Sequence, residues 1–233
     1  MMNTTKKIAT GILAAAMLTS SIAFGVTANA AEKKTDETNP TNSTVITKYI
    51  DPEYGALGAA ISIEDVVGKE VSVDDVKNVE ADTKDITTLL LDDYEPIYEG
   101  ATIVVSPEED FKGTSTITFD VDDKTYNATY IALDYENPAS TFKVDGENFK
   151  EEFDTSTMIH TEFESTIERS VNIKAAKGWK ITNVSAYGYD VFDEDMDKTS
   201  YKADLEDFMY LQVTFQNDHT GAEIQLMMTN DDF

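Results

Sequence analysis

The stretch from residue 101 to residue 133 constrains the fold most, because it carries the clearest two-residue periodicity in the sequence. Apolar and polar residues alternate from Ile117 to Val121, which is typical of a strand with one buried face. Asp122-Asp123-Lys124 predicts a polar turn, and the alternation resumes from Tyr126 to Ala132. The central motif is therefore predicted to be an antiparallel β-hairpin.

Short strand-like segments separated by turn residues continue through the chain. We expect six or seven short strands between residues 44 and 135, including a buried strand at Ile86–Leu91, and one helical turn, for which both Ser62 and Ser72 are candidate caps. In the second half the expected strands are Met158–Phe163, Ile167–Ala175, Trp179–Val191, Phe208–Phe215 and Ala222–Met228.

The segment Glu136–Ser140 is the predicted domain border, because Pro138 has no backbone donor for a sheet. The pattern indicates an all-β chain with two small antiparallel β-sandwich domains, 44–136 and 140–233. A loop inside one larger sheet is the alternative.

Residues 1–30 have the pattern of a secretory signal peptide. Lys6 and Lys7 precede a largely apolar stretch, and Ala28-Asn29-Ala30 matches the small-x-small cleavage pattern. A retained anchor is the alternative, but a cleavage motif follows the apolar stretch where a charged stop would stand. We expect cleavage after Ala30, secretion, and no integral membrane segment afterwards. The polar residues 31–43 are expected to form a flexible leader.

The chain is strongly acidic, with 45 acidic and 18 basic residues and a formal charge of −27. Such a field repels nucleic acid and anionic polymers and attracts cationic proteins and divalent cations, so we exclude nucleic-acid binding. The charge could equally serve solubility alone. An apolar content of 41% indicates a real core, and a chain without cysteine must stabilise that core by packing.

One stretch resembles a known class of module. The run SPEEDFKGTSTITFDVDD places Asp110-Phe111-Lys112-Gly113 before an alternating strand and an acidic turn after it. It is similar to the closing strands of cadherin-like and immunoglobulin-like (Ig-like) β-sandwich modules of bacterial secreted and surface proteins. The resemblance implies a spacer, adhesion or calcium-binding role. Only one such run is present, so a tandem array is not supported.

The densest cluster of oxygen ligands is Asp193, Asp195 and Asp197. Carboxylates at alternate positions can converge on calcium, which takes six to eight oxygens. The helix-loop-helix calcium motif requires glycine and glutamate where this chain has Lys198 and Asp204. A calcium site and a solvated acidic loop both stay open. A weaker cluster of the same kind contains Asp120, Asp122 and Asp123.

Trp179, Tyr187 and Tyr189 share one parity on a single predicted strand. An exposed row of these rings would offer a platform for a sugar, whereas a buried row would be core. Gly188 would break the parity if it marks a bulge.

Enzyme chemistry has little support in the sequence. The chain lacks cysteine, has only His160 and His219, and carries no nucleophile elbow, zinc-binding spacing or phosphate loop. We expect a non-catalytic binding protein of the bacterial surface or medium, with a protein or carbohydrate partner. A carbohydrate-binding accessory protein and a carboxylate-pair glycoside hydrolase are the alternatives.

Overall fold

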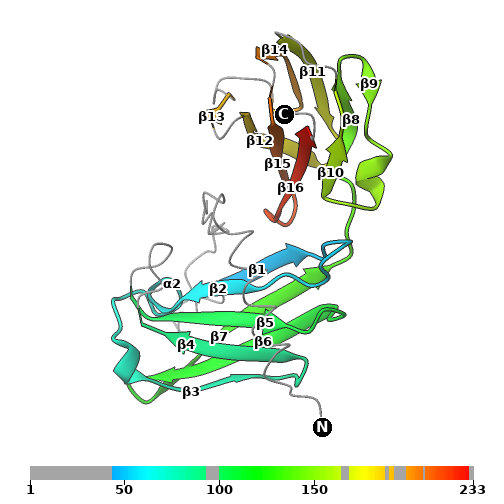
Figure 1. Cartoon of the computed structure of the whole chain (residues 1–233). Helices are drawn as coiled ribbons and strands as arrows, with labels where there is room; N and C mark the ends of the chain where they lie inside the picture. The colour runs from blue at the N-terminus through cyan, green and yellow to red at the C-terminus, as the bar shows by residue number, and fades with distance from the viewer. Residues whose placement is uncertain are drawn as a thin grey trace. The chain divides into compact units, whose positions relative to one another are not determined.

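The computed structural model describes residues 44–92, 100–163, 168–186, 189–191, 198–206 and 208–230, but not the side chain of Tyr189. Within these ranges the strands form four sheets, beside one short helix and two single 3-10 turns (Figure 1). The all-β prediction is confirmed. No helix in the described ranges combines the length and the apolarity needed to cross a membrane.

The chain divides into two compact, sandwich-like units that are interleaved along the sequence. The first contains Leu57–Pro107 and Thr116–Ala128, and the second contains Val45–Ala56, Glu108–Ser115 and Thr129–Phe233. The domain border predicted between residues 136 and 140 stays a prediction, because contacts rather than one cut in the chain define these units.

The strands of the first half form two sheets, with orders β2-β5-β4 and β1-β7-β6-β3. Their bounds are β1 (Thr44–Tyr49), β2 (Ala59–Ser62), β3 (Val76–Ala81), β4 (Ile86–Leu91), β5 (Thr102–Pro107), β6 (Gly113–Val121) and β7 (Lys124–Leu133).

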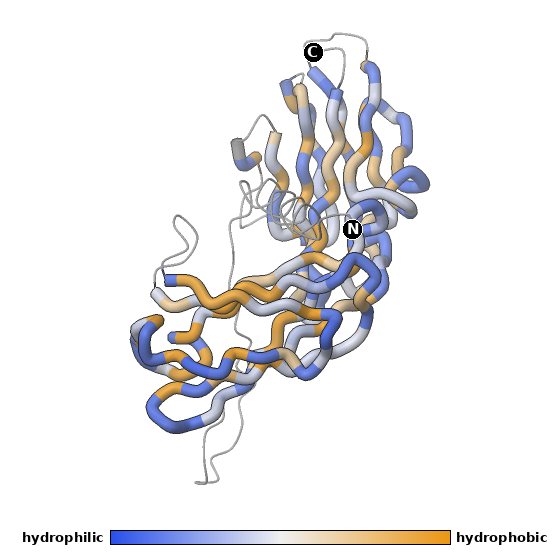
Figure 2. Tube along the Cα trace, turned by 60° about the horizontal axis from the view of Figure 1, so that its bottom comes forward, coloured by the Kyte–Doolittle hydropathy of each residue, from blue (hydrophilic) through white to orange (hydrophobic). Residues whose placement is uncertain are grey.

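The predicted central hairpin is formed by β6 and β7, with the two-residue loop Asp122-Asp123 between them. Both loop residues have positive φ, 51° and 58°, as a type I′ turn requires. Ile117, Phe119 and Val121 are almost fully buried. Figure 2 shows hydrophobic and hydrophilic residues alternating along strands. The two-residue periodicity therefore gave the correct buried face.

The expected helical turn is α2 (Ile63–Val67). The Ser62 side chain accepts a hydrogen bond from the Asp65 backbone N–H, and Gly68 ends the helix at φ 80°. Ile63 and Val66 are buried. The turns η2 (Val73–Asp75) and η3 (Glu152–Asp154) are single 3-10 turns.

The prediction of a buried strand at Ile86–Leu91 is wrong in part. These residues form β4 at the edge of its sheet, and Leu89 is 51% exposed although Ile86 is buried. A continuous apolar run carries no periodicity, so it could not show which side chains face water.

The second half adds a four-stranded sheet, β14-β11-β8-β9, and a five-stranded sheet, β10-β16-β15-β12-β13. The bounds are β8 (Ala139–Val144), β9 (Glu147–Asn148), β10 (Met158–Thr161), β11 (Glu168–Ala175), β12 (Trp179–Ala186), β13 (Tyr189–Asp190), β14 (Ser200–Glu206), β15 (Tyr210–Asn217) and β16 (Glu223–Asn230).

The order of these strands is Ig-like. The first, second and fifth Ig strands correspond to β8, β11 and β14 in one sheet, and the last two to β15 and β16 beside β12 in the other. After β9 the chain leaves the four-stranded sheet, and β10 pairs with β16 of the five-stranded sheet in parallel. The antiparallel prediction is corrected at the β10–β16 pair, because β10 reaches the last strand from the opposite sheet and not through a hairpin.

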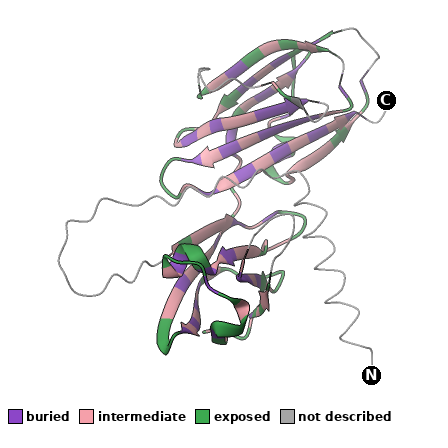
Figure 3. Ribbon diagram, turned by 90° about the vertical axis from the view of Figure 1, so that its left-hand side faces the viewer, coloured by how far each residue is buried: buried purple, intermediate pink, exposed green. Residues whose placement is uncertain are grey.

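The core of the second unit lies between its two sheets. Buried residues alternate with less buried ones along the strands (Figure 3). The core contains Phe142 and Ile173 from one sheet and Val213, Phe215 and Leu226 from the other. Burying each such side chain contributes about 1.5–3 kcal/mol to the free energy of unfolding.

The sequence missed β8 and β14 as strands. In β14, whose sequence is SYKADLE, charged residues outnumber large apolar ones. The strand β8 begins inside the segment predicted to be the domain border. Pairing with β11 on both sides supplies their backbone hydrogen bonds, and this pairing is a tertiary effect.

Candidate binding surface

Trp179, the first residue of the predicted aromatic row, is a core residue. It is 5% exposed, and its ring centroid lies 5.2 Å from that of Tyr49. Its ring is not available for stacking on a sugar. Tyr187 and the side chain of Tyr189 lie outside the described residues. Of the two interpretations left open by the sequence, the structure supports a core role for Trp179.

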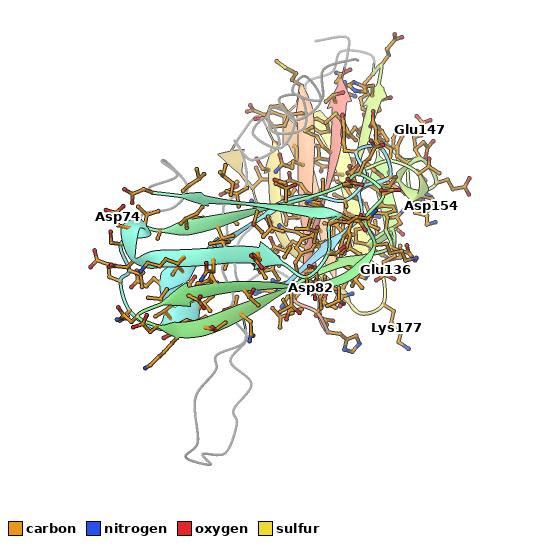
Figure 4. The ribbon with its side chains drawn as sticks, turned by 90° about the horizontal axis from the view of Figure 1, so that it is seen from below. Asp74, Asp82, Glu136, Glu147, Asp154 and Lys177 are labelled. Atoms are coloured by element: carbon orange, nitrogen blue, oxygen red, sulfur yellow. The ribbon has the colours of Figure 1, made fainter. Side chains whose placement is uncertain are left out.

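Asp193, Asp195 and Asp197 also lie outside the described residues, so a calcium site there stays a prediction. Across the described ranges, no three acidic or histidine side chains come together in a way that could hold a metal ion. Asp154, which is labelled in Figure 4, instead pairs with Lys150 at 2.7 Å and accepts a hydrogen bond from Asn137.

The weaker acidic cluster is engaged in structural contacts. Both carboxylate oxygens of Asp120 accept hydrogen bonds at 2.6 Å, one from Thr125 and one from Asn78. These bonds, with Thr125 contributing most, lower the pKa of Asp120. Asp122 accepts a 2.6 Å bond from Lys69, which lowers its pKa. These carboxylates therefore stabilise the β6–β7 hairpin end.

A different surface emerges on the outer side of the five-stranded sheet. Along β15 and β16 every second residue is buried, and the intervening residues point away from the core. The register between β12 and β15 shifts between Ile181 and Asn183. Because of this shift, β12 keeps one buried face and one outward face along its length. We name this surface the amide face, and it comprises Asn183, Ser185, Tyr210, Gln212, Thr214, Gln216, Gln225, Met227 and Thr229.

The register of the strands arranges the amide face in rows. Asn183, Thr214 and Gln225 form one row. The next row places Gln212 between Ser185 and Met227. In a third row Tyr210 pairs with Thr229, and Thr229 with His160 of β10. The first two rows contain no charged residue on β12, β15 and β16, and the second row continues from Ser185 to the acidic Asp190 of β13.

Gln212 is the most buried of the amide residues in the amide face. It is 9% exposed, and within the described residues its amide makes no side-chain hydrogen bond. The same holds for Ser185, which is also 9% exposed. No fully buried side-chain nitrogen or oxygen in the described residues lacks a partner, so the Gln212 amide reaches the surface and can bind a ligand.

The other polar groups of the face differ in how strongly they are engaged. Asn183 Nδ2 donates to Asp190 Oδ1 at 2.9 Å, and Thr229 Oγ1 lies 2.7 Å from His160 Nδ1. Gln225 Nε2 donates to Thr214 Oγ1 at 3.5 Å, which is long for a hydrogen bond. The side chains of Gln212, Thr214 and Gln225 are therefore the ones most available to a ligand that lies across the strands.

One end of the amide face is charged. Lys180, Gln216 and Glu223 form the terminal row, and Gln216 Nε2 donates to Glu223 Oε1 at 3.4 Å. Burial raises the pKa of Glu223, while the charges of Lys48 and Lys180 offset part of that rise. Burial also lowers the pKa of Lys48, against the attraction of Glu223. The row therefore becomes more positive as the pH falls.

A partial signal for this surface is present in the amino-acid sequence. The alternation of Tyr210, Gln212, Thr214 and Gln216 with apolar residues is visible in the sequence, but these polar residues would normally only face solvent. Their assembly with Ser185 and Met227 depends on which strands become neighbours.

The Ig-like strand order and the amide face define a β-sandwich with a polar surface on the outer side of one sheet. No protein-family model and no curated protein sequence matches the chain.

Several solved structures are distantly similar. SGBP-B of the Bacteroides ovatus mixed-linkage glucan utilization locus, in complex with a mixed-linkage heptasaccharide, is 9% identical at a TM-score of 0.25, over 80% of this chain and 43% of that one. Domains 5–6 of the S-layer protein SbsC are 12% identical at a TM-score of 0.28, over 82% of this chain and 95% of theirs. The titin Ig tandem A164–A165 is 9% identical at 0.23, over 82% and 94%.

These matches include the Ig and bacterial surface modules that the sequence resembles. The chain spans less than half the length of the first two matches, 43% and 30%. The TM-scores are below 0.5, so the fold assignment rests on the strand order itself.

Proposed function

We propose that the chain is an exported, non-catalytic binding module whose ligand lies on the amide face. The observation that carries this proposal is Gln212, a nearly buried amide without a side-chain partner in the described residues, which lies between the uncharged residues Ser185 and Met227. A site that needs hydrogen-bond donors and acceptors in fixed positions is built in this way. Two acids lie beside the face: Asp190 pairs with Ser185 and accepts a hydrogen bond from Asn183, and Glu223 lies in the terminal row.

The location of the protein follows from its first 30 residues. The basic start, apolar stretch and Ala28-Asn29-Ala30 motif support export. Outside the cell the strong negative charge keeps the protein soluble and away from anionic polymers. The uncharged residues around Gln212 suit a partner without negative charge.

A neutral polysaccharide is the second, more specific candidate for the ligand. Sugar hydroxyls both donate and accept hydrogen bonds, as do the amides and hydroxyls of Gln212, Thr214 and Gln225. Tyr210 is half-buried on the same face, two residues from Gln212, and its ring can pack against a sugar.

Titration calorimetry with soluble neutral polysaccharides tests this candidate. The variant Q212A/Q225A should bind about thirtyfold more weakly, because two hydrogen bonds of about 1 kcal/mol each are lost. The variant N172A, an amide removed from the other sheet, should bind like the wild type. Binding that survives Q212A/Q225A would exclude the amide face, and a wild type that binds none of the polysaccharides would exclude the carbohydrate ligand.

Site-specific photo-crosslinking in the producing cells tests the binding module for any partner class. A crosslinker at Thr214 should give a defined adduct, whereas a crosslinker at the exposed Thr87 of β4 should not. Equal adducts at both positions, or none at Thr214, would contradict the proposed surface.

A further inference from the structure

The outer face of the four-stranded sheet carries opposite charges at its two ends. Its outward positions lie on β8, β11 and β14, which are neighbours in the order β14-β11-β8 (Figure 1). Lys143 and Lys202 flank Asn172 in one row, and Lys174 lies two residues farther along β11. We name these three residues the lysine end.

The other end of this face is acidic. Ser170 pairs with Asp204, and Glu168 pairs with Glu206. Asp145, directly after β8, lies beside Ser170, because its carboxylate accepts a hydrogen bond from the Ser170 backbone N–H. We name Asp145, Glu168, Asp204 and Glu206 the acidic end, in which the Asp145 carboxylate also pairs with Arg169 Nη1 at 2.8 Å.

The lysine end is not neutralised within its own unit. Lys174 and Lys202 are exposed and Lys143 is half-buried, and in the described part of the chain these three lysines make no salt bridge. Other lysines do, such as Lys69 with Asp122 and Lys112 with Asp134. In a chain with 45 acidic residues, three neighbouring lysines without a carboxylate partner form a local positive surface.

We propose that this face binds a second copy of the chain, face to face, around a two-fold axis that runs across the strands. Rotation about this axis reverses the strand direction. It places each strand of one copy over the same strand of the other copy. Lys174 then lies over Glu168 of the second copy, because both are on β11 at opposite ends. On β14, Lys202 lies over Asp204 of the second copy.

The same arrangement places a lysine over an acid on the third strand, β8. Lys143 on β8 lies over Asp145 of the second copy, and each contact occurs twice because the interface is isologous. The axis passes between the rows of Asn172 and Ser170, which meet as an uncharged polar pair. The spacing between rows two residues apart, about 7 Å, is common to both copies, so the three pairs form in one register.

Charge complementarity favours a second copy over an anionic ligand. An anion would meet the lysine end but also the acidic end about 7 Å away along β14, and the whole chain would repel it. A copy of the same face presents both charges in the complementary order. The overall repulsion between copies acts over longer distances and is screened at about 0.15 M salt, where the Debye length is about 8 Å.

Sedimentation equilibrium of the purified chain, expressed with its own residues 1–30, tests the proposal. Near 0.15 M salt the wild type should dimerise at concentrations up to about 0.5 mM, as a weak interface requires. The variant K174E/K202E should weaken the dimer more than about tenfold. The variant K77E/K84E makes the same charge change at exposed positions of the first unit and should leave the dimer intact.

A mixing experiment excludes a mere effect of charge or folding. The variant E168K/D204K should also be monomeric alone, yet an equimolar mixture with K174E/K202E should form heterodimers, because each face then complements the other. Circular dichroism confirms that both variants are folded. A monomeric wild type, a dimer that survives K174E/K202E, or folded variants that fail to associate would each overturn the proposal.

Discussion

At the scale of single residues, the one arginine of the chain shows how this acidic protein uses a cation inside its core. Arg169 is 2% exposed, its Nη1 lies 2.8 Å from Asp145 Oδ2, and its guanidinium lies 4.5 Å above the Phe163 ring. A buried cation requires an anion and hydrogen bonds, and a planar guanidinium can stack on a ring at the same time. Arg169 therefore ties β11 to the β8–β9 hairpin.

Replacement of this arginine should be costly. We expect R169M to lower the free energy of unfolding by about 2–4 kcal/mol, since Asp145 loses its partner and Phe163 its cation. R169K should recover part of the loss, because an ammonium can pair but not stack. Urea denaturation measures both, with K177M at an exposed loop position as the control. A change below about 0.5 kcal/mol, the usual size for a surface substitution, would contradict the buried ion pair.

At the scale of elements, two hairpins use the same turn with different residues. The β6–β7 loop is Asp122-Asp123, and the β8–β9 loop is Asp145-Gly146. All four residues have positive φ. Glycine adopts this conformation without steric cost, whereas aspartate does so less readily. The β6–β7 hairpin is therefore the more strained of the two at its second position.

Asp123 is the position where this difference can be measured. D123G should raise the free energy of unfolding by about 0.5–1 kcal/mol, and D123A should lower it by a similar amount, because only glycine relieves the positive φ. Asp122, which pairs with Lys69, is left unchanged in both variants. Thermal melting is the measurement. Equal shifts for glycine and alanine would show that the φ angle at this position does not limit stability.

At the scale of the whole molecule, packing must oppose a large self-repulsion. The chain has a formal charge of −27 and no cysteine that could form a disulfide. The second unit is held by an apolar core between its sheets, and in the first unit Ile103, Ile117 and Phe119 are fully buried. Neutralising part of the charge with a bound cation would stabilise the folded state.

Calcium is the cation to test, because Asp193, Asp195 and Asp197 lie at alternate positions. Calcium should raise the melting midpoint above that in chelator, and D193N/D195N/D197N should remove most of the rise. Magnesium at equal concentration controls for general screening, and E147Q/E151Q/E152Q controls for the lost charge at exposed positions. Identical midpoints in calcium and chelator would end the calcium hypothesis.

Strands with one apolar face and one polar face could be predicted from the amino-acid sequence alone. The alternation in β6, β7, β15 and β16 predicted these strands and their buried sides, and Asp122-Asp123 and residues 217–221 predicted the loops. This succeeds because a strand with one buried face must place its apolar residues at every second position.

The order of strands within each sheet, in contrast, depends on the tertiary structure. The burial of Trp179, the position of Gln212 between Ser185 and Met227, and the meeting of the three lysines of the lysine end all follow from strand order. Period-two alternation specifies a face but not the strand beside it. Surfaces assembled across strands are therefore fixed by long-range pairing, which is where both proposed binding faces arise.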